Sequence, residues 1–270
     1  MHYKIVSDSS SNLFSLSGVD YAYVPLKIIS SEKEYTDNEQ LVVGSMIEDL
    51  KKIKTPTGTS CPNMTEWSEA FSGADAAFAV TISSNLSGSC SAAMQAAEEH
   101  GNVFVIDSLS AGAEMQLIIE KLQEYIQAGM EYEAICRQIK EYQKTTKLIF
   151  CLESLTNLAR NGRVGMATAK IAGVLGIRVV GKASDVGTLE PQHKCPGERR
   201  ALATIWEDMQ KEGYHGGKVR INHCLNEDAA QQLKATICRK WNDADVQIVP
   251  CTGLCSFYAE EGGLIIGYET

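Results

Sequence analysis

The feature that most constrains the fold is an alternation of short apolar runs of high β propensity with longer segments of helical periodicity. The runs that predict strands are 3–6, 21–29, 76–82, 103–106, 148–152, 177–180, 219–223, 246–249 and 264–268. Helices are predicted over 113–128, 131–146, 198–211 and 226–241, where apolar side chains recur every three or four residues. Strands that alternate with helices are typical of α/β proteins with a substantial parallel sheet.

The length of 270 residues is enough for two modest α/β lobes. No Pro- or Ser-rich linker separates them. Two predicted helices follow one another just before a new strand begins, which places the boundary there. We therefore expect an N-terminal α/β lobe, 1–146, with a parallel sheet and serine turns at its strand ends. The C-terminal α/β lobe would comprise 147–270.

The net charge of −9 disfavours non-specific binding to nucleic acid or to an anionic membrane surface. It does not exclude a small anionic ligand, because one nearby cation outweighs distant charges. The longest apolar runs, 76–82 and 171–177, are too short to span a bilayer, and the first residues lack the apolar core of a secretory signal. We expect a cytoplasmic protein with no nucleic-acid partner and no membrane span.

The nine cysteines are scattered along the chain. Only Cys251 and Cys255 form a close pair, and no second pair or nearby histidine completes a zinc set. A disulfide framework is not expected in a cytosolic chain of this size. The sequence therefore predicts mostly buried free thiols, which pack as small apolar groups, with no metal and no cofactor. A metal or redox role is the alternative.

Hydroxyl-rich turns follow three of the predicted strands: 7–11 (SDSSS), 83–89 (SSNLSGS) and 107–112 (DSLSAG). In open α/β sheets, ligands bind in the crevice beyond the carboxyl ends of the strands. Free N–H groups at helix starts, together with serine hydroxyls, suit an anionic oxygen. Each turn alone is explained equally by helix N-capping. Three such turns, with Gly88 and Gly112 allowing close backbone approach, favour an anion site.

A fourth hydroxyl-rich segment contains Thr59 and Ser60. These residues form an extended stretch just before Asn63 and Glu66, whose spacing is that of a capping box at the start of a short helix. Their hydroxyls would add to the anion site. The alternative is a solvated loop.

Arg163 stands on a corner of the second half of the chain, after Gly162 ends one helix and before a second helix predicted from 166 to 175. Its planar guanidinium suits a carboxylate or a phosphate; capping of helix carbonyls is the alternative. Small residues stand at 167, 169, 172, 173 and 176. Because these side chains are small, the inner side of that helix leaves room for an apolar ligand or for close helix packing.

Five segments, in order and at plausible spacing, resemble motifs of the DegV family across nearly the whole chain. They are Ser7-Asp8-Ser9-Ser10 (the family's D-S-T turn), Thr59-Ser60-Cys61-Pro62 (T-S-Q-P), 83–88 (S-S-x-L-S-G), 106–111 (I-D-S-x-x-A), and 158–163 followed by 171–177 (L-x-x-G-G-R, a helix, and the L-L-x-I-K-P strand). Each motif alone is weak, whereas the ordered set is specific.

The resemblance implies an N-terminal lobe with a parallel sheet and a C-terminal α/β lobe that buries the tail of a long-chain fatty acid, with its carboxylate between the lobes. Thr59 and Ser84 would hydrogen-bond the carboxylate, and Arg163 would supply positive charge. The ligand-binding residues predicted in this way are Thr59, Ser60, Ser83, Ser84, Ser87, Arg163 and Tyr258. The resemblance further implies a carrier rather than an enzyme, which presents the acid to a separate fatty acid kinase subunit for acyl phosphate formation.

The chain departs from the family at one position. Members usually carry a histidine in an H-x-G-P-G stretch near the C-terminus, and here Tyr258 stands in its place, with Glu260 and Glu261 nearby. A tyrosine hydroxyl still donates to a carboxylate, whereas the two acids disfavour an anion unless they point outward. Arg199 and Arg200 fall where members carry basic residues that meet the kinase; ordinary surface charge is the alternative.

Two other functions remain open from the residues alone. A serine-dependent acyl hydrolase would use Ser84 or Ser87, although no G-x-S-x-G elbow surrounds them and no histidine stands in a motif that marks a partner base. A phosphate- or nucleotide-binding regulatory domain would use the same strand-end turns, although neither a Walker-type motif nor G-x-G-x-x-G is present. The absence of an obvious catalytic base favours the carrier.

Overall fold

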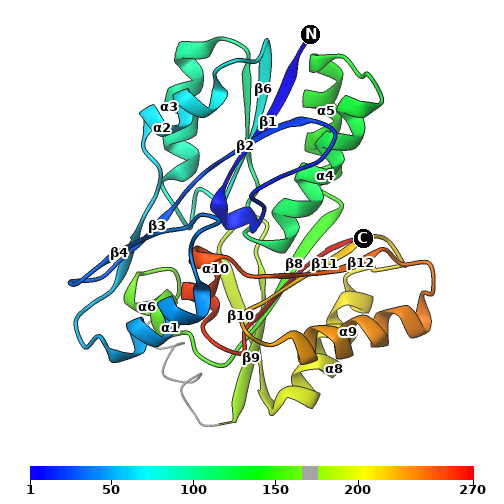
Figure 1. Cartoon of the computed structure of the whole chain (residues 1–270). Coiled ribbons are helices and arrows are strands. Elements are labelled where there is room, and N and C mark those ends of the chain that lie inside the picture. Colours follow the sequence, from blue (N-terminus) through cyan, green and yellow to red (C-terminus); the bar gives the residue numbers. More distant parts are fainter. Residues whose placement is uncertain (166–175) are drawn as a thin grey trace.

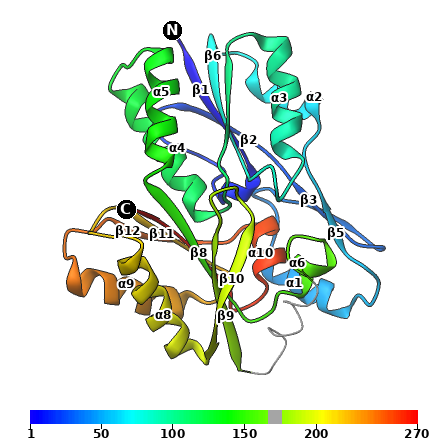
Figure 2. The same ribbon diagram turned by 180° about the vertical axis from the view of Figure 1, so that it is seen from behind.

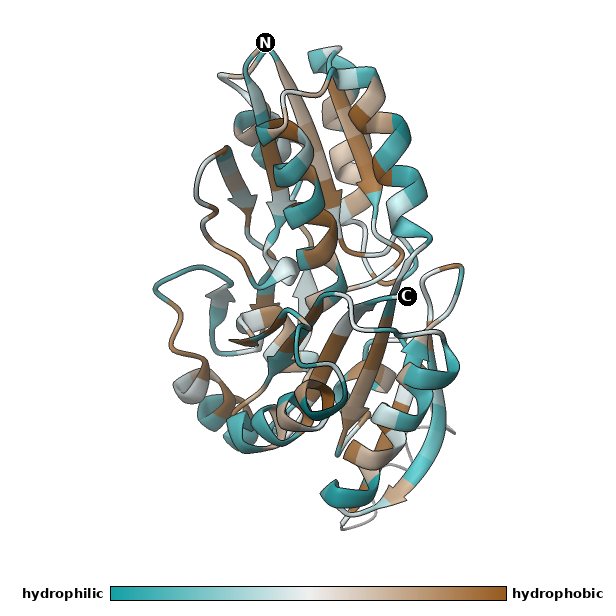
Figure 3. Cartoon of the chain, turned by 90° about the vertical axis from the view of Figure 1, so that its right-hand side faces the viewer, coloured by the Kyte–Doolittle hydropathy of each residue, from teal (hydrophilic) through white to brown (hydrophobic). Residues whose placement is uncertain are grey.

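The computed structural model of the chain describes residues 1–165 and 176–270, so the helix predicted over 166–175 lies outside the described residues. Two large sheets lie one above the other, each covered by helices (Figure 1). Hydrophobic residues are concentrated on the strands and on the inner sides of the helices (Figure 3). In the described ranges, no helix is long and apolar enough to cross a bilayer.

The first sheet is entirely parallel, as predicted, with the strand order β2-β1-β6-β7. Its strands are β1 (Tyr3–Asp8), β2 (Asp20–Val24), β6 (Ala76–Thr81) and β7 (Val103–Asp107). Helices α2 (Met64–Phe71) and α3 (Ser89–His100) cover one face, and α4 (Ala113–Gln127) and α5 (Tyr132–Gln143) cover the other (Figure 2). Along β6, Ala77 and Ala79 pack toward α2 and α3, whereas the larger Phe78 and Val80 pack toward α4 and α5. A strand buried on both faces is expected in such a sheet.

The second sheet is mixed, with the order β10-β9-β8-β13-β11-β12, and within it only β11 and β12 pair in parallel. Its strands are β8 (Thr146–Leu152), β9 (Ile177–Ala183), β10 (Leu189–Pro196), β11 (Val219–His223), β12 (Val246–Pro250) and β13 (Leu264–Glu269). Ile149 and Cys151 of β8 face α8 (Glu198–Lys211) and α9 (Glu227–Lys240). Leu148, Phe150 and Leu152 face the opposite side, as the two-residue period of a strand requires. The α/β fold with a parallel N-terminal sheet is thus confirmed.

A third, small sheet was not predicted. The single strand expected over 21–29 is wrong: Pro25 lacks the N–H that a continuing ladder needs, and the chain leaves β2 to begin β3 (Lys27–Ile29) in another sheet. There β3 pairs antiparallel with β4 (Glu34–Thr36) and β5 (Gly58–Ser60). This sheet and helix α1 (Val43–Lys52) share a core with residues of the second sheet. The division at residue 146 into two lobes stays a prediction.

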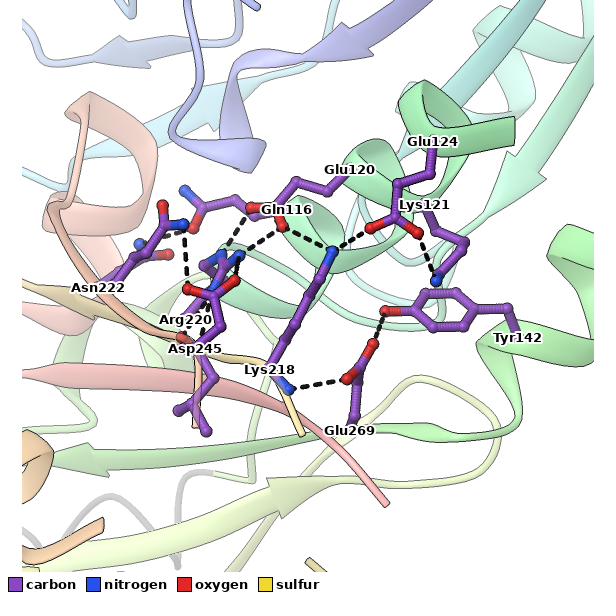
Figure 4. Close-up of polar contacts among 12 residues, drawn as sticks. Gln116, Glu120, Lys121, Glu124, Tyr142, Lys218, Arg220, Asn222, Asp245 and Glu269 are labelled. Atoms are coloured by element: carbon purple, nitrogen blue, oxygen red, sulfur yellow. Dashed lines mark hydrogen bonds and ion pairs between the residues drawn. The ribbon is translucent and has the colours of Figure 1, made fainter. Parts of the chain in front are cut away.

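Helix α4 joins the two halves, because its apolar side packs on the parallel sheet while its other side contacts β8, β11 and β13. At that contact Arg220 of β11 is 2% exposed and donates both to Glu120 of α4, at 2.6 Å from Nε and 2.6 Å from Nη2, and to Asp245, at 2.7 Å (Figure 4). Two further donations reach the carbonyl oxygens of Val219 and Asp245, so all five guanidinium N–H groups are used. Lys218 pairs with Glu124 beside this network.

Replacing Arg220 with Ala should lower the free energy of unfolding by about 3 kcal/mol, because Glu120 loses its bidentate partner in a largely buried setting. Urea denaturation monitored by circular dichroism measures the change. Arg200→Ala is the matched control, since Arg200 forms an exposed pair with Glu207 and such pairs contribute at most about 1 kcal/mol. Equal losses in the two variants would contradict the assigned role of the network.

Candidate functional site

The three serine turns follow the carboxyl ends of β1, β6 and β7, and the buried carboxylate of Asp8 links the first two. It accepts hydrogen bonds from the backbone N–H groups of Ser10 (3.2 Å) and Ile82 (2.9 Å) and from the hydroxyls of Ser10 and Ser89. Burial raises the pKa of Asp8 above its ordinary value, although these donors lower it. The Ser10 and Ser89 hydroxyls therefore serve the architecture. Of the N-caps considered, Asp8 caps the short 3-10 helix Ser9–Ser11, whereas α3 and α4 begin at Gly88 and Gly112 without a side-chain cap.

An apolar cavity lies between the serine turns and the second sheet. Its wall includes Leu26 and Ile82 from the first half of the chain and Leu152, Leu158, Leu254 and Ile265 from the second. The space within it is about 70 Å³, less than half of an engineered protein cavity of about 150 Å³ that holds benzene. The cavity is thus an apolar site that is narrow in this structure.

Four of the predicted site residues come together on the wall of this cavity: Thr59, Ser87, Arg163 and Tyr258. The hydroxyls of Thr59 and Tyr258 lie 2.8 Å apart. Arg163 donates from Nε to the carbonyl oxygen of Leu86 at 2.9 Å and from Nη1 to that of Asn161. In 1–165 and 176–270, no carboxylate lies within 4.0 Å of this guanidinium, and its other N–H groups bond to none of those residues.

The pKa of Tyr258 is raised by burial, against the lowering effect of the Thr59 hydroxyl and of the positive charge of Arg163. Tyr258 is therefore a neutral donor at physiological pH. Together the side chains supply two hydroxyls, a phenol and a guanidinium beside an apolar space. Such a set suits an anionic group attached to an apolar body.

The other three predicted residues do not line the cavity in the described structure. Thr59 lies opposite Ile28 in the small sheet, so the next residue, Ser60, projects from the other face. Ser83 is fully buried and donates to the carbonyl oxygen of Gly187 at 2.7 Å, which anchors the turn between β9 and β10. Ser84 is exposed, and its backbone N–H bonds to Asp107.

Sequence reasoning missed helix α10 (Gly253–Ala259), which carries Leu254, Cys255 and Tyr258 to the cavity. The first N–H groups of the helix, those of Gly253 (2.5 Å) and Leu254 (3.0 Å), donate to the buried carboxylate of Asp37, and so does the hydroxyl of Thr252 (3.2 Å). Burial raises the pKa of Asp37 to about 6, in spite of these donors. Thr252 before an apolar run was a local signal for this helix, but no local pattern indicates a cap that comes from residue 37.

Among the described residues, no histidine lines the cavity, and its wall includes one cysteine, Cys255. His100 bonds to Ser68, His193 pairs with Asp208 and His223 accepts from the N–H of Asn226. Across the described part of the chain, no histidine hydrogen-bonds to Ser84 or Ser87. The nine cysteines are free and mostly buried, as predicted. Burial raises the pKa of Cys255, which keeps this thiol at the cavity wall uncharged.

The fold and the site define an α/β protein with an apolar cavity that has polar groups on its wall. The family model described as "Uncharacterised protein, DegV family" matches residues 2–270. A DegV domain-containing protein of Streptococcus gordonii is 40% identical over 100% of this chain and 99% of its own length. The chain belongs to the DegV family.

Two solved structures superimpose closely on this one. A DegV family protein from Eubacterium eligens, loaded with heptadecanoic acid, has a TM-score of 0.97 and 40% identity, with 99% of each chain covered. The Fatty Acid Kinase (Fak) B3 protein of Streptococcus pneumoniae, loaded with linoleic acid, has a TM-score of 0.97 and 38% identity, covering 100% of this chain and 99% of that one. The relatives thus include proteins seen with fatty acids bound.

The pKa of Asp37 predicts a specific pH dependence of stability. Because its folded-state pKa of about 6 lies above the ordinary 3.8, the folded chain binds this proton more tightly than the unfolded chain. The contribution of this proton to the free energy of unfolding is fully present below about pH 4. It is lost as the pH rises through 6, which lowers the free energy of unfolding by about 3 kcal/mol in total. Urea unfolding of the wild type and of Asp37→Asn between pH 4 and 7.5 isolates the effect. If the free energies of unfolding of the two proteins differed by the same amount at every pH in this range, the assigned role of Asp37 would be contradicted.

Proposed function

We propose that this protein is a carrier that binds a long-chain fatty acid, with the tail in the apolar cavity and the carboxylate at Thr59, Ser87, Arg163 and Tyr258. The observation that carries the proposal is the gathering of these four side chains, from four separate segments, beside an otherwise apolar space. The close structural match to proteins loaded with heptadecanoic and linoleic acids supports it.

The energetics of the two ends of the ligand favour such a site. A tail of about 15 buried carbons contributes on the order of 12 kcal/mol at roughly 0.8 kcal/mol each, before the cost of ordering it. Burying a carboxylate without hydrogen-bond partners costs more free energy than the site could recover. Here the guanidinium of Arg163 has N–H groups without partners among the described residues, and the Thr59–Tyr258 pair supplies hydroxyl donors. These groups offset the desolvation of the head group.

The narrow cavity bears on how the acid would be accommodated. Since about 70 Å³ is less than a long acyl chain fills, the lining side chains must move apart as the tail is bound. Aliphatic side chains such as Leu26, Leu86 and Leu254 form much of the wall. They lose no hydrogen bonds when they rearrange, so widening costs mainly packing contacts.

We further propose that the bound acid is presented to a fatty acid kinase subunit that forms the acyl phosphate. The similarity to the Fatty Acid Kinase B3 protein supports this partner. Arg199 and Arg200 are exposed at the start of α8 and are candidates for the contact. The lack of any histidine bonded to Ser84 or Ser87 in the described structure agrees with a carrier that leaves the chemistry to another protein.

Native mass spectrometry of the protein purified from bacteria should show a bound fatty acid. After delipidation, added palmitate or oleate should raise the thermal unfolding temperature, because a ligand at a hundredfold excess over its Kd adds about 2.7 kcal/mol of stability. ATP and phosphate serve as controls that test the nucleotide alternative. Stabilisation by nucleotide and none by either fatty acid would overturn the proposal.

Arg163→Ala should weaken fatty acid binding by about 1.5–3 kcal/mol, the range for losing a hydrogen bond to a charged group. Isothermal titration calorimetry with delipidated protein measures the loss, which corresponds to about ten- to a hundredfold in Kd. Arg160→Ala is the matched control, because Arg160 lies only three residues earlier, at the end of α6 (Thr156–Arg160), is exposed and does not line the cavity. If the two variants bound the fatty acid with equal affinity, Arg163 would not be part of the head-group site.

A further inference from the structure

Two asparagine side chains connect the short helix α6 to two other segments of the proposed head-group site. Asn157 lies in the first turn of α6, and Asn161 is the residue that closes the helix. The amide nitrogen Nδ2 of Asn157 donates to the carbonyl oxygen of Phe257 at 2.8 Å, and that of Asn161 donates to the carbonyl oxygen of Thr57 at 3.3 Å. Both bonds therefore join α6 to segments that are distant in sequence.

The two acceptors stand next to residues that line the cavity. Phe257 precedes Tyr258 on α10, and Thr57 comes two residues before Thr59 of β5. Because the hydroxyls of Thr59 and Tyr258 lie 2.8 Å apart, this pair forms only if β5 and α10 are held at one separation. Helix α6 is bonded to both segments, through one amide each, so it fixes that separation.

Arg163 is connected to the same helix by its backbone and by its guanidinium. Its N–H donates to the carbonyl oxygen of Leu158 at 2.7 Å, and Nη1 donates to that of Asn161. From the other side, Nε donates to the carbonyl oxygen of Leu86, the neighbour of Ser87. The peptide group of Asn161 is thus one of the points that orient the guanidinium.

The Asn161 amide does more than cap its own helix. Its donation to the carbonyl oxygen of Asn157, at 2.9 Å, is an ordinary contact at a helix end. The bond to Thr57 leads instead to β5, and a Cβ at Gly58 would lie 3.4 Å from Oδ1 of Asn161. In the motif L-x-x-G-G-R that this segment resembles, position 161 is a glycine, which has no amide. The link between α6 and β5 therefore depends on the asparagine of this chain.

We propose that Asn161, together with Asn157, is a positioning residue of the head-group site, which holds Thr59, Tyr258 and Arg163 at the mutual distances that a carboxylate requires. This inference rests on the proposed function. Neither amide is on the part of the cavity wall that the structure describes. Donors that are fixed before the ligand arrives bind it more tightly, because binding does not then have to order them. Loss of the Asn161 amide should therefore weaken the hold on the carboxylate and spare that on the tail.

A double-mutant cycle of Asn161→Ala and Arg163→Ala tests this role, with palmitate titrated into delipidated protein by calorimetry. Alone, Asn161→Ala should raise the Kd about five- to tenfold, within the range of coupling between residues of one hydrogen-bond network. Added to Arg163→Ala, it should raise the Kd less than about twofold, because the guanidinium that it positions is absent. Asn157→Ala with Tyr258→Phe forms a second, independent cycle with the same expectation, which decides the question if Asn161→Ala does not fold.

A neutral ligand and a matched variant separate positioning from general destabilisation. 1-Hexadecanol, supplied to every variant from cyclodextrin, has the same tail as palmitate without the charge, so its Kd should change less than about twofold in Asn161→Ala. Asn226→Ala is the matched control, because Asn226 also donates twice from Nδ2, to Glu198 at 2.9 Å and to the carbonyl oxygen of Gly262 at 3.0 Å. It is not on the described cavity wall, and its variant should bind palmitate as the wild type does.

The possible failures point to different conclusions. Unchanged palmitate affinity in Asn161→Ala, with a loss in Arg163→Ala, would overturn the positioning role and leave the proposed function standing. Additive losses in the cycle, or equal losses for palmitate and 1-hexadecanol, would overturn it as well, because the amide would then stabilise the fold rather than the head-group site. If the wild type binds no palmitate, the proposed function itself fails.

Discussion

Helix α4 is the constraint on which the rest of the molecule depends, because it is buried between two sheets of different construction. Its apolar residues, among them Met115 and Ile118, pack on the parallel sheet. Its opposite side meets the second sheet with polar side chains, and Gln116 and Glu120 bond to Asn222 and Arg220 there. Polar groups buried in this way need matched partners, so the helix fixes how the two sheets face each other. The cavity lies where the strand ends of the first sheet meet the second.

The need of buried polar groups for partners also explains the positions of most hydroxyl groups in the serine turns. Asp8 and Asp37 are fully buried carboxylates, and each must be surrounded by donors. Ser10 of the first turn, together with Ile82 and Ser89, surrounds Asp8, while the start of α10 surrounds Asp37. The hydroxyls used in this way hold strand ends and helix starts in place. Thr59 and Ser87 lie on the cavity wall, which is why they are the candidates for ligand binding, although the Ser87 hydroxyl also accepts from the N–H of Ser89 at the start of α3.

Much of the fold follows from the sequence, and the exceptions have physical causes. The parallel strands are continuous apolar runs, so their periodicity and length identify them. Strand β10 escaped prediction because it is a polar edge strand with Pro191 and Pro196, which an edge tolerates and a central strand does not. Within the S-S-x-L-S-G motif, the choice between Ser84 and Ser87 depends on the turn geometry that Ser83 fixes through its bond to Gly187. A contact across more than 100 residues leaves no local pattern in the sequence.

Tyr258 distinguishes the anion site that we propose for this member of the family. A histidine at this position would carry a charge that varies near neutral pH, whereas the buried phenol stays protonated, because burial raises its already high pKa. Among the described residues on the cavity wall, the positive charge comes from Arg163, which remains charged at any physiological pH. Glu260, the nearest acid in sequence, accepts instead from Ser154 and the N–H of Asn157, at the start of α6. These local donors satisfy the Glu260 carboxylate, so among the described residues on the cavity wall the charged group is the Arg163 guanidinium, beside neutral hydroxyls.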